Sequence, residues 1–482
     1  MTINLYENYG LFIDGRWSAS ASGITRPVVD PASEESVGTI PDATEDDLDR
    51  AIAAAEKGFA TWRHVQPWER ARILRSVADR LRARSDELAN LMVEETGKPR
   101  AEAVGEWSAT VDQFEWYAEE TKRIYGHSLD GRHPDVRLSV IFQPVGVVAA
   151  FSAWNFPALL PARKIAAALA AGCSIIIKPA SEAPGSAMAI VKACEEAGIP
   201  DGAVNLVTGD SALISRHLIA STVIRKISLT GSVPVGKQLL RLAADGVKKA
   251  SMELGGHAPV IVFADADPHE AGKACATAKF RNAGQVCISP SRFYVHEKIY
   301  ASFVESFVQT TALLKLGHGR EDGVTMGPMA SRRGLEAAQV LVADAIEKGA
   351  TLLTGGRVPS GFDRGFFFEP TVLGRVPDGA RIMQEEPFAP IAPITSFTDY
   401  DDVIERANSV PFGLAGYVFS SDLRLATKAA QDLETGMVGV NDLLLAAAEA
   451  PFGGIKESGM GREGGMLGIR DYLEAKYIKT RI

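Results

Sequence analysis

The segment from Val145 to Gly255 alternates short apolar runs with helical stretches, and this alternation constrains the fold more than any other feature of the chain. Each run has the length of a strand and is apolar throughout, which is typical of a parallel sheet covered by helices on both faces. The segment therefore predicts a doubly wound α/β domain. Its expected strands are Val147–Ser152, Ser174–Lys178, Val204–Val207, Ile224–Leu229 and Lys249–Leu254, and its expected helices are Pro157–Ala171, Pro184–Ala197 and Val233–Ala243.

A second α/β series begins at Pro259. A chain of 482 residues is too long for one simple core, so two or three domains are expected, with the Gly255-Gly256 pair as the hinge between two of them. The second series predicts strands at Pro259–Phe263, Arg292–His296, Thr351–Thr354, Phe366–Val372, Ile391–Phe397 and Ala415–Phe419. Its expected helices are Pro268–Arg281, Tyr300–Leu314, Arg333–Lys348, Asp401–Asn408 and Leu423–Leu433.

The N-terminal region is expected to add a hairpin and three helices. Asp14-Gly15 favours a tight hairpin turn. Thr44, followed by three acidic residues, is a typical helix cap. A second helix is expected from Pro67 to Gly97, and a third from about Ala101 to Tyr117.

Two strand-like segments lack an obvious core of their own. Arg123–Val140 is polar, contains glycines and a proline, and runs into a β-prone stretch; Tyr472–Ile482 reads as an extended strand. One interpretation is an oligomerisation arm. The other is a surface loop and a frayed tail, and the pattern alone favours neither.

The bulk properties exclude several function classes. The formal net charge of −9 argues against non-specific nucleic-acid binding, which needs a basic surface. None of the four cysteines forms a CxxC pair, so neither a zinc site nor a redox dithiol is indicated. The N-terminus lacks a signal-peptide pattern, and no uncharged run approaches the roughly 20 residues of a membrane helix. We therefore expect a cytoplasmic protein without a metal, a nucleic-acid partner or a membrane partner.

A nucleotide site is suggested at the carboxyl ends of the predicted strands, where open α/β sheets bind ligands. No G-x-G-x-x-G fingerprint is present, but Gly231-Ser232 opens a helix whose free N–H groups can hold a phosphate. Lys178 ends a strand and is either a lysine at the sheet edge or a donor to ribose hydroxyls. Ser181 follows where an acidic residue would repel a 2′-phosphate, so NADP is open as well as NAD.

Cys287 stands out among the four cysteines because it lies in a turn, between Gly284-Gln285 and Ser289-Pro290. The other three cysteines lie in or beside alanine-rich helical stretches and fit the ordinary role of a small buried hydrophobe. A thiol in a turn can be presented as a nucleophile, although a structural role is possible for it too.

Three further polar residues each have a structural and a functional interpretation. Glu253 precedes Gly255-Gly256 and is a capping carboxylate or, if buried, a general base. Asn155 caps a helix or donates to an oxyanion. Glu386 is a loop carboxylate or an acceptor for ribose hydroxyls.

Taken as an ordered set, seven motifs resemble the aldehyde dehydrogenase superfamily over essentially the whole chain. They are Trp154-Asn155-Phe156-Pro157, Lys178-Pro179, Thr230-Gly231-Ser232, Met252-Glu253-Leu254-Gly255-Gly256, Gly284-Gln285-Val286-Cys287, Glu386-Pro387-Phe388 and Pro451-Phe452-Gly453-Gly454. The resemblance implies a dinucleotide-binding domain at 1–122 and 142–254, a catalytic domain at 255–440, and a β arm at 123–141 and 470–482 that joins a homodimer or homotetramer.

The resemblance also implies a role for each motif. Cys287 attacks an aldehyde, Asn155 holds the oxyanion, and Glu253 activates the water that hydrolyses the resulting thioester, so that a difficult step is divided into two. NAD or NADP accepts the hydride. The implied cofactor residues are Ser152, Trp154, Lys178, Ser181, Gly209, Gly231, Ser232, Val235, Leu254, Glu386 and Phe388, and the implied substrate residues are Arg163, Phe156, Ile288 and Leu445.

Within the superfamily, the chain is most similar to succinate semialdehyde and 2-oxoglutarate semialdehyde dehydrogenases. The resemblance implies that Arg163 binds the distal carboxylate of the substrate, a pairing that suits the fork of a guanidinium. Ala446 departs from the usual serine of the succinate semialdehyde enzymes and lies in the apolar run 443–448. That run favours an alternative, a dehydrogenase for aromatic or apolar aldehydes. A second alternative is a catalytically silent NAD-binding structural relative, against which the intact Cys287, Glu253 and Asn155 speak.

Overall fold

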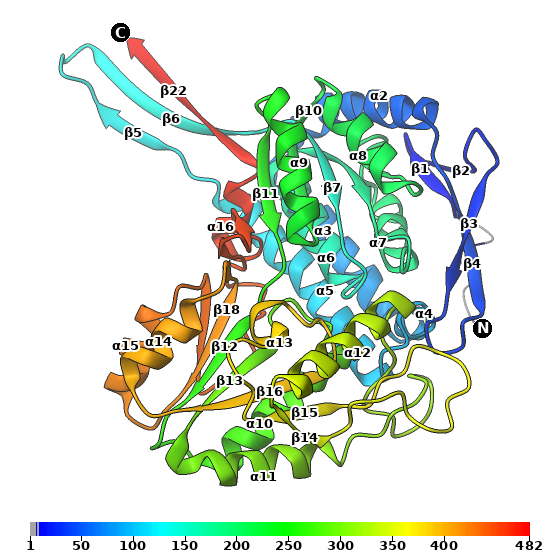
Figure 1. Ribbon diagram of the computed structural model, residues 1–482. Helices are drawn as coiled ribbons and strands as arrows, with labels where there is room; N and C mark the ends of the chain where they lie inside the picture. The colour runs from blue at the N-terminus through cyan, green and yellow to red at the C-terminus, as the bar shows by residue number, and fades with distance from the viewer. Residues whose placement is uncertain (1–5, 7–8) are drawn as a thin grey trace.

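The structure is a computed structural model that describes residue 6 and residues 9–482. Its upper half in Figure 1 is built on an eight-stranded sheet with the order β2-β1-β9-β8-β7-β10-β11-β21. The central strands β9, β8, β7, β10 and β11 are parallel, whereas β1, β2 and β21 pair antiparallel with their neighbours. The strands are β1 Leu11–Ile13, β2 Arg16–Ser18, β7 Val147–Phe151, β8 Ser174–Lys178, β9 Val204–Leu206, β10 Ile224–Thr230, β11 Lys249–Glu253 and β21 Gly459–Met460.

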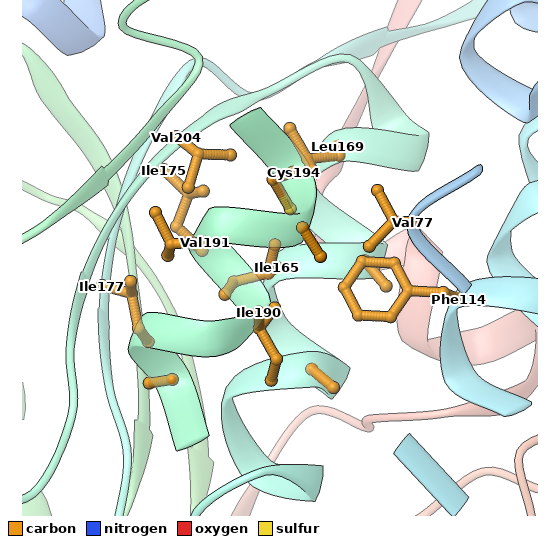
Figure 2. Packing of buried hydrophobic residues seen from close by; sticks show 14 of the residues in the cluster. Val77, Phe114, Ile165, Leu169, Ile175, Ile177, Ile190, Val191, Cys194 and Val204 are labelled. Atoms are coloured by element: carbon orange, nitrogen blue, oxygen red, sulfur yellow. The ribbon is translucent and has the colours of Figure 1, made fainter. Parts of the chain in front are cut away.

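Helices cover both faces of this sheet because alternate residues of each buried strand point to opposite sides. Val148 and Ala150 pack with α3, α5, α6 and α7, whereas Val147 and Ala149 pack with α2, α8 and α9. Figure 2 shows Cys194 of α7 among apolar side chains of β8, β9, α6 and α3. The helices are α2 Glu45–Trp62, α3 Pro67–Ala83, α4 Ser85–Thr96, α5 Arg100–Glu120, α6 Leu159–Ala171, α7 Gly185–Glu196, α8 Ser211–Ala220, α9 Val233–Asp245 and α16 Gly465–Arg470, with the short 3-10 turn η1 Thr121–Arg123.

The lower half in Figure 1 contains a seven-stranded sheet with the order β14-β15-β16-β13-β12-β18-β19. Helices α10 and α11 pack on one face and α12, α14 and α15 on the other. The strands are β12 Ala258–Val262, β13 Pro290–His296, β14 Thr351–Thr354, β15 Thr371–Gly374, β16 Ile391–Phe397, β18 Ala415–Phe419 and β19 Met437–Val440. The helices are α10 Pro268–Phe280, η2 Arg281–Gly284, η3 Glu297–Ile299, α11 Tyr300–Thr311, α12 Arg332–Glu347, α13 Arg381–Gln384, α14 Tyr400–Asn408 and α15 Leu423–Asp432.

A three-stranded antiparallel sheet projects from the body of the molecule (Figure 1). It is formed by β5 His127–Asp130, β6 Val136–Pro144 and β22 Leu473–Arg481, and β22 pairs with β6 over its whole length. The two strand-like segments of the sequence thus form one sheet rather than a loop and a frayed tail. Their role in subunit association stays a prediction.

The doubly wound α/β class is confirmed, since the sheet at the N-terminal side and the one after Gly256 are both parallel in their centres and covered by helices. The chain changes sheet between β11 and β12, where the Gly255-Gly256 hinge was expected; the domain boundaries themselves stay predictions. Three features were not expected: the return of β21 to the first sheet, and two small antiparallel sheets of two strands each. One sheet pairs β3 Thr25–Val29 with β4 Ser36–Pro41, and the other pairs β17 Phe412–Gly413 with β20 Ile455–Lys456.

Two predictions of individual elements were wrong. The expected helix from Pro67 to Gly97 is divided into α3 and α4 at Arg84, where the backbone leaves the helical region with φ −111° and ψ 5°. The expected strand Phe366–Val372 begins only at Thr371. By contrast, Asp14 and Gly15 form the hairpin turn with φ of 50° and 75°, and Thr44 caps α2 through a reciprocal bond with Asp47.

Within the described part of the chain, no helix is long and apolar enough to cross a membrane. The same residues contain no group of three or more His, Cys, Asp or Glu side chains that could hold a metal ion.

Candidate active site

A pocket of about 470 Å³ lies where the carboxyl ends of β7, β8, β10 and β11 face the second sheet. This is where ligands bind in open parallel sheets, because the strand ends and the helix N-termini meet there. Cys287, Glu253 and Asn155 all line the pocket. Residues that are 132 positions apart in the chain, as Asn155 and Cys287 are, therefore converge on one cavity.

A strained turn presents Cys287. Asn282, Ala283 and Gly284 have φ of 48°, 53° and 71°, so that three successive residues adopt the left-handed conformation. For a residue with a Cβ, this costs about 1 kcal/mol or more. Cys287 is of intermediate exposure as a residue, whereas the other three cysteines are buried. The turn therefore exposes the one cysteine that the sequence singled out.

Hydrogen bonds tie Asn155 to this turn. The side-chain Nδ2 of Asn155 donates to the carbonyl oxygen of Gln285 at 3.1 Å. The carbonyl oxygen of Asn155 accepts from Asn282 Nδ2 at 3.1 Å and from Lys98 Nζ at 2.9 Å. The amide of Asn155 is thus fixed beside the cysteine turn, with one of its two N–H groups free for another acceptor.

A buried ion pair supports the Asn155 segment, and the sequence analysis missed it. Lys98 Nζ lies 2.6 Å from Glu106 Oε2, and both side chains are almost fully buried. The other oxygen of Glu106 accepts from the backbone N–H groups of Ala158 and Leu159, at 2.8 and 3.2 Å. Glu106 thereby satisfies two free donors at the start of α6, while Lys98 holds the carbonyl of Asn155.

Glu253 ends β11 with its side chain only 3% exposed, and neither carboxylate oxygen has a hydrogen-bond partner among the described residues. Burial and, to a smaller extent, the nearby Glu463 carboxylate raise the pKa of Glu253 to about 8, although the charges of Arg163 and Lys164 oppose the shift. A carboxyl group with a pKa near the working pH can take and return a proton.

The surroundings of Cys287 disfavour its thiolate form. Burial and the negative charge of Glu253 raise the pKa of Cys287 well above its ordinary value, and Arg163 opposes them. Reactivity of the thiol thus depends on the charges that surround it.

The opposite end of the pocket has the donors and acceptors that a dinucleotide needs. Ser232 is the N-cap residue of α9, and its side chain makes no cap bond, so the N–H groups at the helix start are free for a phosphate. The Lys178 ammonium, whose pKa burial lowers to about 8, bonds only the carbonyl of Pro179 at 3.0 Å. Glu386 Oε1 accepts from the N–H of Gly256 at 3.1 Å, and its second oxygen has no hydrogen bond to any residue that the structure describes. These residues fit the riboses and phosphates of NAD or NADP.

Two aromatic rings narrow the middle of the pocket. Trp154 and Phe388 meet edge to face, with ring centres 5.6 Å apart. The pocket lining includes ten of the eleven cofactor residues that the sequence predicted, namely Ser152, Trp154, Lys178, Ser181, Gly231, Ser232, Val235, Leu254, Glu386 and Phe388. Gly209 is not part of the lining; it packs against Asp42 and Ala43, and its role stays a prediction. The lining also contains Glu182 and Arg333, which the sequence analysis did not single out.

Three of the four predicted substrate residues belong to the apolar core of the second half or pack against it. Phe156 and Ile288 are buried in one apolar cluster, against which Cys287 and Leu445 pack. The apolar run 443–448 is half exposed, and Leu444 at 76% exposure points away from this cluster. The run therefore contributes only some of its side chains to the surroundings of the thiol.

Arg163 is a buried cation without an acidic hydrogen-bond partner. Its side chain is 3% exposed, its guanidinium carbon lies 4.1 Å from the centre of the Phe452 ring, and its Nε has no partner among the described residues. Its charge lowers the pKa values of both Cys287 and Glu253, which places it near the reacting groups. Arg281, which the sequence analysis missed, lies 5.3 Å from the centre of the Phe156 ring.

Comparisons with known proteins give one consistent result. The model of the aldehyde dehydrogenase family matches residues 17–478. The chain is 44% identical over 467 residues to a glutarate-semialdehyde dehydrogenase of Pseudomonas putida, covering 97% of this chain and 96% of that one. It is 43% identical over 475 residues to an NADP-dependent succinate-semialdehyde dehydrogenase of Escherichia coli, covering 98% of each. The crystal structure of a succinate-semialdehyde dehydrogenase from Burkholderia pseudomallei superposes with a TM-score of 0.97 at 42% identity, covering 98% of each chain.

Proposed function

Because the chain belongs to the aldehyde dehydrogenase family and oxidises an aldehyde with NAD or NADP, we propose that its substrate is a carboxylated semialdehyde of four or five carbons, such as succinate or glutarate semialdehyde. The relatives named for these two substrates are similar to the chain over nearly its full length. The observation that carries the proposal is the buried guanidinium of Arg163 close to Cys287, which has no acidic partner within the part of the chain that the structure describes.

The proposed reaction proceeds through a covalent intermediate on Cys287. Ionised Glu253 takes the proton of the Cys287 thiol and releases it to solvent. The resulting thiolate attacks the aldehyde carbon and forms a thiohemiacetal, whose oxyanion accepts from the Asn155 side-chain N–H and the backbone N–H of Cys287. Bound NAD or NADP accepts the hydride. The thioester that remains on Cys287 is hydrolysed by a water from which Glu253 removes a proton, and the carboxylic acid leaves with the thiol restored.

Arg163 suits the recognition of a second negative charge on the substrate. A buried cation with no anionic partner costs free energy, and a substrate carboxylate that pairs with it relieves that cost. A guanidinium binds a carboxylate through two parallel hydrogen bonds, which also fixes the orientation of the chain that carries the aldehyde. Arg281 places a second guanidinium next to Phe156, another of the predicted substrate residues.

The test compares two aldehydes of the same length in wild type and in Arg163→Met. Loss of the pairing is expected to lower kcat/KM for succinate semialdehyde by roughly 30- to 1000-fold, and that for butanal by less than about threefold. The substitution removes the guanidinium that stacks on Phe452 and leaves an unbranched apolar side chain in its place. Equal losses on both aldehydes would reject the carboxylate pocket. Arg332→Gln is the control, because Arg332 is exposed and pairs with Glu34.

We further propose that the arm formed by β5, β6 and β22 joins a homodimer or homotetramer. Its strands are largely exposed, and Leu129, Tyr477 and Ile478 present apolar surface on them. An exposed sheet of this kind is normally covered by another chain. Size-exclusion chromatography with light scattering on the full chain, and on Tyr477→Asp, tests this; a monomeric wild type would reject it.

The four free thiols suit a reducing compartment, and we propose the cytoplasm.

A further inference from the structure

Arg70, on α3, is a second buried cation without an anionic partner, and it lies away from the active site. Its side chain is 6% exposed, and among the described residues its guanidinium takes part in no hydrogen bond or ion pair, with Nε completely enclosed. Burial lowers the pKa of Arg70 to about 10, and no carboxylate offsets the shift. Buried arginines are rare unless they are paired, because the desolvation of the charge is otherwise uncompensated.

Arg70 lines a pocket of about 370 Å³ at the base of the arm, which we call the arm-base pocket. Its walls come from the end of α2, the start of α3, η1, the end of β6 and the first residue of β22. Arg63, His64 and Lys122 line it beside Arg70, and none of the described lining residues is acidic. The pocket shares no lining residue with the cofactor pocket.

The cations of the arm-base pocket are only partly neutralised by their surroundings. Lys122 pairs with Glu119 at 2.7 Å, on the rim, while Glu119 also serves Arg75. Arg63 stacks on Phe59 with its guanidinium carbon 4.9 Å from the ring centre and has no acidic partner in the described chain. The lining of the arm-base pocket thus carries an excess of positive charge, to which the buried Arg70 contributes.

The C-terminal end of α6 does not account for Arg70. The guanidinium passes close to Gly172, where an added Cβ would lie 2.1 Å from its Nη1. The carbonyls of the last turn of α6 already accept from other donors: Leu169 from Trp62 Nε1 at 2.9 Å, and Ala170 from Thr121 Oγ1 at 2.7 Å. Arg70 is therefore not needed to satisfy them, and its own donors remain unused.

We propose that the arm-base pocket binds a small multivalent oxyanion, with Arg70 as the central ligand and Arg63 and Lys122 at the rim. The guanidinium fork suits the paired oxygens of a phosphate or a carboxylate, and several cations favour a dianion over a monoanion. Phosphate and short dicarboxylates share this chemistry. Binding would neutralise the charge that is left uncompensated at the junction of α3, α6 and the arm.

The test measures thermal unfolding of the full-length protein in sodium phosphate, in sodium succinate and in sodium chloride at matched ionic strength and pH. A ligand that binds only the folded state raises Tm with a saturating dependence on concentration. We expect wild type to gain at least about 2 °C at about 10 mM phosphate or succinate relative to chloride. The anion that gives the larger gain in Tm, phosphate or succinate, identifies the oxyanion class. Isothermal titration with that anion gives the Kd.

Two variants separate the pocket from general salt effects and from phosphate in the cofactor site. Arg70→Met is expected to lose the gain, while its Tm in chloride equals or exceeds that of wild type and its kcat and KM are unchanged. Arg72→Gln, on the same helix but exposed and paired with Glu69, is expected to behave as wild type. Equal gains in Arg70→Met and wild type, or no gain in wild type, would overturn the proposal.

A third variant keeps the test decisive if Arg70→Met does not fold. Lys122→Gln changes a side chain that is 16% exposed and leaves the buried guanidinium of Arg70 in place. It is expected to weaken the Kd for the stronger anion at least about threefold, since one of the pocket's positive charges is removed. An unchanged Kd would overturn the assignment of the anion to this pocket.

Discussion

The pKa of Glu253 leads to a quantitative prediction for the pH dependence of turnover. A general base must be ionised, so the rate of thioester hydrolysis follows the ionised fraction of Glu253. With a pKa of about 8, this fraction is roughly 1% at pH 6, 10% at pH 7 and 50% at pH 8. Where hydrolysis limits turnover, kcat is expected to rise about tenfold from pH 6 to pH 7 and about fivefold from pH 7 to pH 8.

The assay follows the reduced cofactor at saturating aldehyde across this pH range, with single-turnover release of the acid as the direct measure of hydrolysis. Glu463→Gln provides the matched electrostatic variant, because the Glu463 carboxylate raises the pKa of Glu253. Its removal also leaves the charge of Lys164 unpaired nearby, which favours the ionised form. The midpoint is therefore expected to move to lower pH by at least about half a unit. A hydrolysis rate that is constant between pH 6 and pH 8 would refute the assignment of the base.

Three further predictions concern residues around the same cavity. Glu253→Gln is expected to raise the free energy of unfolding by up to roughly 3 kcal/mol at pH 7. The reason is that the native pKa of Glu253 exceeds the unfolded value of 4.5, so that the wild-type protein loses stability as the pH rises between these two values. The gain vanishes near pH 4, and chemical denaturation at pH 4 and pH 7 measures it. Glu182→Gln is expected to raise kcat/KM for NADP by roughly three- to tenfold with little effect on NAD, because the Glu182 carboxylate lies in the pocket near Lys178 and repels a 2′-phosphate; an unchanged cofactor ratio at low salt would contradict this. Lys98→Met is expected to lower the free energy of unfolding by about 3–5 kcal/mol, since Glu106 is left as an unpaired buried charge. It is also expected to lower kcat more than it raises KM, because the Asn155 segment loses the Lys98 hydrogen bond. Lys57→Met, at an exposed ion pair, is the control for both measurements.

The elements that were predicted correctly are those whose local sequence pattern favours the same structure that they adopt in the folded protein. The apolar strands β7, β8 and β10 and the Thr44 cap have strong local signals, and the structure contains them within a residue or two. The break at Arg84 was missed, because the apolar spacing continues across it from Leu81 to Leu88 while the backbone does not. The strand β21 has only two residues, and its pairing with β11 is a long-range contact that no local pattern carries.

The candidate site was predictable where a motif contains the functional group itself, as for Cys287, Glu253 and Asn155. The groups that hold or tune them were not predictable. Lys98 and Glu106 look like ordinary helix charges in the sequence, and only the fold buries them against the carbonyl of Asn155. Glu463 lies more than 200 residues after Glu253 and acts on it through space. The only sequence signal for this pair is its spacing: Lys98 lies in the short loop before α5, and Glu106 lies eight residues later on that helix. Charged residues at such a spacing are common on protein surfaces.

The most direct test of the proposed chemistry is mass spectrometry of Glu253→Gln after incubation with succinate semialdehyde and the cofactor. The account predicts a burst of about one reduced cofactor per active site and a succinyl group on the peptide that contains Cys287, because the thioester forms but is not hydrolysed. An unmodified Cys287 after such a burst, or an adduct on Cys173, Cys194 or Cys275, would contradict the account.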